Sequence, residues 1–307
     1  MSQANKTAPI VGIAPDSWGV WNAVDPMQPG PGQYLREVAE AGFHWTEIGP
    51  YGYLGTDPAK LAAELQIHEL TVSAGTVFTG LHRGASEVEV AWKAVSDVAK
   101  LVGALGAEHV ITLPEMWSRD ESGHISSSRE FNAEEWQYIL AGQNEIGRRL
   151  LEEFGLKQQF HAHAETQVGS EKEIVRLLEG TDPRYLNLCL DTGHYSYYFG
   201  DSVDLINRFP DRIGYLHLKQ VEPVLMAHVL KNDISFVEAV RLGLMVEPPH
   251  GIPPYAPILE AAQKANPGIF AIIEQDMYPV GDFSKPLQIA KRTREYIAGC
   301  GTPVTFR

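Results

Sequence analysis

The feature that most constrains the fold is a repeated alternation of short apolar runs with longer amphipathic segments along the chain. Short apolar runs bounded by Gly, Pro or polar residues are typical of buried strands, whereas apolar residues recurring every three or four positions indicate helices. The expected strands cover residues 10–14, 43–48, 70–74, 109–113, 157–163, 187–190, 213–218 and 269–274.

The segments between these runs carry helix signals. Pro58 stands at a first helical position after Asp57, and Asn132 precedes Glu135 by three residues, as in a capping box. The expected helices cover residues 34–41, 58–67, 87–105, 132–154, 170–178, 201–209, 255–265 and 286–298. Residues 115–131 and 221–254 are expected to be loops, the second with a short helix near 236–242. A loop as long as the second one is usually a functional lid or binding loop.

Strands that alternate with helices at this spacing are expected to be parallel, with right-handed crossovers. Eight such units, without a composition shift that marks a domain boundary, predict one α/β domain over residues 1–307, folded as a closed (β/α)₈ barrel. The alternative, a doubly wound dinucleotide-binding sheet, lacks its Gly-x-Gly-x-x-Gly fingerprint after the first strand.

The charge of the chain limits its partners. Lys and Arg number 25 against 39 Asp and Glu, which gives a formal net charge of −14 and disfavours nucleic acid. Residues 1–9 are polar, without the apolar core of a signal peptide, and no apolar run approaches the length of a membrane span. Cys189 and Cys300 are too few and too distant for a disulfide framework. We therefore expect a cytoplasmic protein that binds no membrane.

Ionisable residues stand where the last four expected strands end. They are His161 and His163, Asp191 and His194, His217 and Lys219, and Glu274. The carboxyl ends of barrel strands face one mouth, so these side chains are expected to converge. Imidazoles and carboxylates without a thiolate suit Mn²⁺, Zn²⁺, Co²⁺ or Fe²⁺. The pattern predicts a divalent metal site, with Asp191 facing the metal and His194 better placed for substrate.

Each of these residues also has an ordinary structural explanation. A strand-end His often bonds to neighbouring backbone, Asp191 could cap the following turn, and Glu274 could pair with a Lys or Arg. The convergence of four strand ends on one mouth favours the metal site over these separate explanations.

Two further residues near the expected mouth are candidates for substrate contact. Trp18, one of several aromatic residues after the first two strands, could stack on a sugar-like ring or could fill the packing. Glu47, close to the end of the second strand, could contact substrate or be the buried partner of a helix terminus.

The strand-end motifs, taken together, resemble the xylose isomerase-like barrel superfamily. The motifs are His-Ala-His at 161–163, Leu-Asp-Thr-Gly-His at 190–194, Leu-His-Leu-Lys at 216–219 and Ile-Glu-Gln-Asp at 273–276. The resemblance spans roughly the whole barrel and implies metal ligands from the last four strands. Asp191, His217 and Glu274 match the family pattern. Many members have Glu on the fifth strand, where this chain has His161 or His163, with His161 the first choice.

The two histidines on the fifth expected strand, in place of the family's Glu, resemble the His-rich fifth strand of inosose dehydratases. The resemblance therefore implies a lyase that dehydrates a keto-polyol, either an inosose-type cyclitol or a keto-sugar, through an enediolate stabilised by the metal, with Mn²⁺ favoured. It implies Glu274 as the base, His163 or His194 as the acid that protonates the departing hydroxyl, and Lys219 as a contact to a substrate oxygen.

Other activities of the superfamily remain as alternatives. A sugar or inosose isomerase or epimerase would share the metal site, and a related lyase would eliminate the aglycone of a 3-keto-glycoside. A nuclease like endonuclease IV is disfavoured by the charge of −14. A non-catalytic binding barrel is the alternative outside enzymes. The resemblance also allows a homo-oligomer, with the number of subunits left open.

Overall fold

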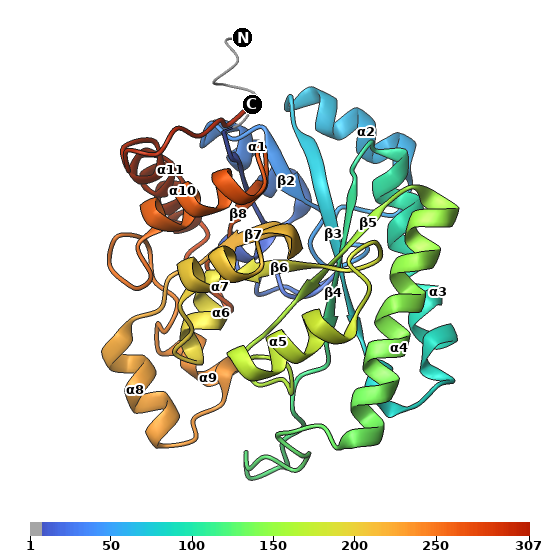
Figure 1. Ribbon diagram of the computed structural model, residues 1–307. Coiled ribbons are helices and arrows are strands. Elements are labelled where there is room, and N and C mark those ends of the chain that lie inside the picture. The colour runs from blue at the N-terminus through green and yellow to red at the C-terminus, as the bar shows by residue number, and fades with distance from the viewer. Residues whose placement is uncertain (1–7) are drawn as a thin grey trace.

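Eight parallel strands close into a barrel in the computed structural model, which describes residues 8–307 (Figure 1). The strands pair in chain order, and β1 pairs with β8 to close the sheet. Their bounds are β1 Ile10–Ile13, β2 Trp45–Glu47, β3 Thr71–Thr79, β4 His109–Pro114, β5 Lys157–His161, β6 Asn187–Asp191, β7 Ile213–Leu218 and β8 Phe270–Ile273. The predicted (β/α)₈ fold is confirmed.

The helices form an outer layer around the strands (Figure 1). Their bounds are α1 Pro31–Glu40, α2 Pro58–Ile67, α3 Glu87–Ala104, α4 Ala133–Arg149, α5 Glu171–Gly180, α6 Thr192–Tyr197, α7 Ser202–Arg208, α8 Pro223–Lys231, α9 Phe236–Arg241, α10 Tyr255–Ala265 and α11 Lys285–Ala298. The expected caps are present. The Asp57 side chain accepts from the backbone at the start of α2, and Asn132 and Glu135 form the capping box of α4.

Three elements differ from the expectation. β5 ends at His161, so His163 lies beyond the strand. α6 follows β6 without an intervening turn. The segment expected as a long loop contains α8 as well as the anticipated α9. Pro223 is the first residue of α8 and the Glu222 carboxylate caps it, so the helix start was encoded locally.

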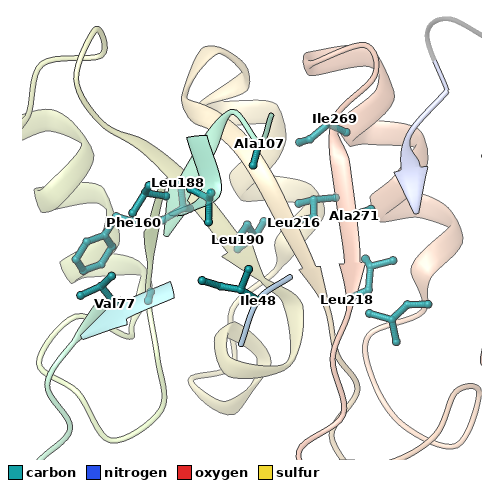
Figure 2. Close-up of a cluster of buried hydrophobic side chains, with 14 of the residues drawn as sticks. Ile48, Val77, Ala107, Phe160, Leu188, Leu190, Leu216, Leu218, Ile269 and Ala271 are labelled. Atoms are coloured by element: carbon teal, nitrogen blue, oxygen red, sulfur yellow. The ribbon is translucent and has the colours of Figure 1, made fainter. Parts of the chain in front are cut away.

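Alternation along the strands divides the core into two parts. Leu188, Leu190, Leu216 and Leu218 belong to the cluster between strands and helices (Figure 2). Their neighbours Cys189 and Tyr215 belong to a separate cluster that includes residues of β3, β4 and β8, and Ala14 directly after β1. Because successive side chains of a strand point to opposite faces, the residues two positions after Cys189 and Tyr215 also point inward. Those residues are Asp191 and His217.

Residues 1–7, which belong to the polar segment considered for a signal peptide, lie outside the described residues. Within residues 8–307, no helix combines the length and the apolar content that crossing a membrane requires.

Candidate metal centre and active site

Four buried side chains from neighbouring strands meet inside the carboxyl-terminal end of the barrel. One ligand atom from each of His161, Asp191, His217 and Glu274 lies within 4.8 Å of all the others. His161 ends β5, Asp191 ends β6 and Glu274 directly follows β8. Asp191 and His217 are also register partners in adjacent strands. The structure thus brings together the four side chains expected to bind metal.

The spacing and the unpaired atoms of this cluster fit a divalent cation. His217 Nδ1 lies 3.0 Å from Glu274 Oε2 and 3.9 Å from Asp191 Oδ2. Two ligands of an ion held at about 2.1 Å are at most about 4.2 Å apart, so a small inward movement would bring all four into range. Within residues 8–307, neither Asp191 Oδ2 nor His217 Nδ1 forms a hydrogen bond of regular geometry, although Lys219 Nζ lies 3.3 Å from the first and Glu274 Oε2 lies 3.0 Å from the second. Buried lone pairs that face one another are costly unless a cation or a proton joins them.

Glu47 sets the orientation of His217. Its Oε1 lies 3.0 Å from His217 Nε2 and accepts a hydrogen bond of 2.9 Å from the Tyr215 hydroxyl. The carboxylate at Nε2 keeps a proton on that nitrogen, so Nδ1 can give up its own proton and present a lone pair to a cation. Glu47 is 1% exposed. The structure therefore places it behind a candidate ligand, whereas the sequence left open contact with substrate or burial against a helix terminus.

Asp191 uses its two carboxylate oxygens separately. Oδ1 accepts a hydrogen bond of 2.7 Å from the backbone N–H of His194 and so caps α6, while Oδ2 faces the cluster. The turn-capping explanation and the metal-ligand explanation are therefore compatible at this residue.

Lys219 balances the negative charge of the centre. Its ammonium lies 2.8 Å from Asp276 Oδ2, 3.1 Å from Glu274 Oε2 and 3.3 Å from Asp191 Oδ2. Burial opposes the charged form, but the three carboxylates outweigh it and hold the pKa of Lys219 above its usual range. Burial would raise the pKa of Asp191, but Lys219 and His161 outweigh it and lower this pKa to about 2. Lys219 and Asp191 are thus both ionised at neutral pH.

The rings of His163 and His194 lie against each other, with centroids 3.7 Å apart and planes tilted by 36°. His163 is half-buried, and its Nδ1 donates to the Ala164 carbonyl at 2.7 Å. Both nitrogens of the buried His194 are engaged, Nδ1 with the Ala164 N–H at 3.2 Å and Nε2 with Lys219 Nζ at 3.1 Å. Burial lowers the pKa of His163 to about 3 and holds that of His194 well below its usual range. Both imidazoles are therefore neutral.

A cavity of about 670 Å³ opens beside the centre. His163 lines it, together with Asp16 after β1 and Asp276 after β8. Burial, with Glu274 and Asp276 nearby, raises the pKa of Asp16 well above its usual range. The sequence analysis did not single out Asp16 as a site residue, although it too follows a strand end.

Trp18 lies elsewhere than expected. Its ring is completely buried against Tyr34, and its Nε1 donates to Glu37 at 2.8 Å. Trp21 lines the cavity in its place. The short helical turn at Pro15–Trp18 carries the Trp18 side chain into the core, which corrects the expected substrate contact at this position.

Comparison with known proteins agrees with this architecture. Residues 35–300 match a family model described as the xylose isomerase-like TIM barrel. The chain belongs to this family. Curated relatives include an inosose dehydratase from Geobacillus kaustophilus, 30% identical over 94% of this chain and 93% of the relative. An inosose dehydratase from Bacillus licheniformis is 28% identical over 95% of this chain and 96% of the relative.

Two solved structures superimpose over nearly the whole chain. The IOLI protein with a binding zinc atom gives a TM-score of 0.70 at 15% identity, covering 94% of this chain and 98% of that one. The probable 3-DHS dehydratase AsbF from Bacillus anthracis gives 0.65 at 15% identity, covering 95% and 99%. These likenesses establish the fold.

Proposed function

We propose that this chain is a divalent-metal-dependent dehydratase that removes water from a keto-polyol, either an inosose-type cyclitol or a keto-sugar. The observation that carries the proposal is the centre of His161, Asp191, His217 and Glu274, in which the β5 position is an imidazole. An imidazole there removes the pair of symmetry-related carboxylates that suits an epimerase, and so favours elimination. The curated relatives named inosose dehydratases support the same reaction class.

Two imidazoles and two carboxylates are the proposed ligands of the cation. Such a donor set suits Mn²⁺, our first choice, and also Co²⁺, Zn²⁺ or Fe²⁺. When bound, the ion would supply Lewis-acid polarisation of the substrate carbonyl, which acidifies the neighbouring C–H bond.

Glu274 is the proposed base for that C–H proton. Burial would raise its pKa, but His217 and Lys219 outweigh burial and hold the pKa below its usual range, so the carboxylate is ionised. Lys219 is proposed to hold a substrate oxygen, because its ammonium stands between Glu274 and the cavity-lining Asp276.

His163 is the proposed proton carrier for the departing hydroxyl. Because a carbonyl only accepts, the contact to Ala164 places the His163 proton on Nδ1 and leaves Nε2 bare. This nitrogen can take up a proton and pass it to the leaving oxygen. His194 is the weaker candidate, since both of its nitrogens have protein partners.

The test is to incubate the Mn²⁺-loaded enzyme with keto-inositols in deuterated water, with mass spectrometry and ultraviolet absorbance as readouts. We expect loss of one water and a new absorbing enone. Glu274→Gln should abolish deuterium exchange next to the ketone. His163→Gln should keep that exchange while dehydration falls by about 100-fold or more. Deuterium uptake with an epimer and no loss of water would overturn the proposal in favour of an epimerase.

A further inference from the structure

The cavity beside the metal centre is larger and more apolar than a bare polyol ring requires. Its volume of about 670 Å³ is in the range that accommodates drug-sized ligands. The acidic and imidazole groups that line it near the centre are Asp16, His163 and Asp276. A sugar or cyclitol, which has hydroxyls around its whole ring, would be expected to meet polar groups on every side.

The wall formed by β3 and α3 is mainly apolar. Val90, Ala94 and Val98 are four residues apart, so they lie on one face of α3, and all three line the cavity. Val77 and Phe78, from the carboxyl-terminal part of the long strand β3, line it beside them. We call these five residues the apolar chamber. Lys93 and Asp97, of opposite charge, also reach the cavity from α3.

Two chamber side chains are unusually open to solvent for their size. Phe78 is 54% exposed and Val90 is 61% exposed. Covering such side chains with an apolar group removes them from water, which is favourable in proportion to the area covered. The chamber adjoins the candidate active site, because the cavity that its five residues line is also lined by His163 and Asp276.

Trp21 joins the polar and apolar parts of this cavity. Its ring stacks on Tyr278, with centroids 5.1 Å apart and planes at 21°, and its Nε1 faces Asp276 Oδ1 at 3.3 Å. Because these two contacts orient the ring, it is a preformed flat surface rather than a mobile side chain. A planar group of a ligand is the natural counterpart of such a surface.

We propose that the apolar chamber binds a flat apolar group attached to the keto-polyol ring. This inference rests on the proposed function, and it makes the substrate class a keto-sugar that carries an aryl or similar aglycone. The elimination then needs no co-reactant. Glu274 takes the proton next to the ketone, the electrons of that C–H bond form the new double bond, and the C–O bond to the β-hydroxyl breaks, while the apolar group stays attached to the ring. The departing oxygen keeps that electron pair and leaves as water after His163 Nε2 passes it a proton taken up from solvent.

Binding is measured first, with unreactive probes. Calorimetry compares phenyl β-D-glucopyranoside with methyl β-D-glucopyranoside on the Mn²⁺-loaded enzyme, its Phe78→Ala and Val90→Ser variants, and Val224→Ser. Val224 is the matched control because it is 76% exposed on α8 and does not line the cavity. We expect the phenyl probe to bind at least about 10-fold more tightly than the methyl probe in the wild type and in Val224→Ser. The two chamber variants should lose that preference.

Equal binding of the two probes, or a phenyl preference that survives both chamber variants, would overturn the inference. A change of subunit number in Val90→Ser, with the phenyl preference intact, would assign the exposed side chains to a contact between copies of this chain. The probes have no ketone, so their binding is independent of the chemistry. If the phenyl preference is observed but keto-inositols are not dehydrated, the proposed function is wrong, whereas the binding of an apolar group by the chamber is supported.

Discussion

At the scale of single residues, the behaviour of the centre depends on groups that do not touch the cation position. Glu47 is the main example, because its carboxylate decides which nitrogen of His217 carries the proton. Tyr215 supports it with a hydrogen bond of 2.9 Å and in turn contacts Ser73 at 2.8 Å. This chain of contacts crosses the barrel interior from β7 to β2 and β3.

Removing the Glu47 carboxylate should therefore weaken metal binding without removing a ligand. We expect Glu47→Gln to lower the affinity for Mn²⁺ by about 10-fold and Glu47→Ala by up to about 100-fold. Calorimetric titration of the metal-free protein measures both. Glu40→Gln, on the exposed end of α1, is the control. Unchanged affinity in both Glu47 variants would show that His217 needs no such partner.

The convergence of Asp191, His217 and Glu274 was predictable, because each stands at the end of a strand in a parallel barrel. The choice between His161 and His163 was not. Strict alternation puts both on one face, but β5 ends at His161, and the backbone then turns so that His163 bonds to Ala164. The burial of Trp18 was equally hidden, since its partner Glu37 lies on α1 and no local pattern links the two.

At the scale of elements, strands and long helices could be predicted because their apolar residues repeat with a fixed period. The loop at residues 115–131 has no such period, and its order comes from contacts with distant segments. Arg119 pairs with Glu165 after β5, and its Nη1 donates to the carbonyl of Gly123 at 2.7 Å. Arg129 lies 2.9 Å from Asp233, between α8 and α9. These segments lie at one end of the barrel (Figure 1).

Breaking the Arg119 pair should destabilise the protein much more than breaking a surface pair. The Glu165 side chain is 4% exposed, so Arg119→Met would leave a buried carboxylate without its partner, at a cost of about 3–5 kcal/mol. Arg148→Met removes exposed pairs on α4 and should cost at most about 1 kcal/mol. Urea unfolding measures both. Equal losses of stability in the two variants would mean that water solvates the Glu165 carboxylate. As a control, adding Glu165→Gln to Arg119→Met should restore most of the lost stability, because it removes the unpaired charge.

For the molecule as a whole, stability in acid depends on another buried histidine, which lies at the end of the barrel opposite to the candidate metal centre. His109 begins β4, packs against Tyr215 and Phe270, and contacts the Gln159 side chain at 3.1 Å. Burial, assisted by Lys157, lowers the pKa of His109 to about 4. The folded protein therefore holds this imidazole neutral, whereas the unfolded chain titrates it near pH 6.5.

Between pH 6.5 and pH 4, the unfolded state binds this proton and the folded state does not, so stability falls as the pH falls. The accumulated loss from His109 alone should approach about 3 kcal/mol near pH 4. His109→Gln should reduce the slope of this part of the profile, to which His163 and His194 also contribute, in urea unfolding measured at several pH values. His124→Gln, on an exposed loop, is the control and should leave the slope unchanged. A slope as steep in His109→Gln as in the wild type would assign the acid sensitivity to the other groups.

The pairing of β1 with β8 has a consequence for how the protein is made. Ile10 is aligned with Phe270, and the Val11 N–H donates to the carbonyl of Thr305. One edge of β1 therefore stays unpaired until the last part of the chain has been synthesised. On the ribosome, the amino-terminal seven strands form an open sheet with two unpaired edges, which are templates for association with other nascent chains. Contacts over such long sequence separations also slow the final closure. A chaperone that shields open sheet edges would therefore be expected to raise the yield of this barrel more than a cofactor added after synthesis.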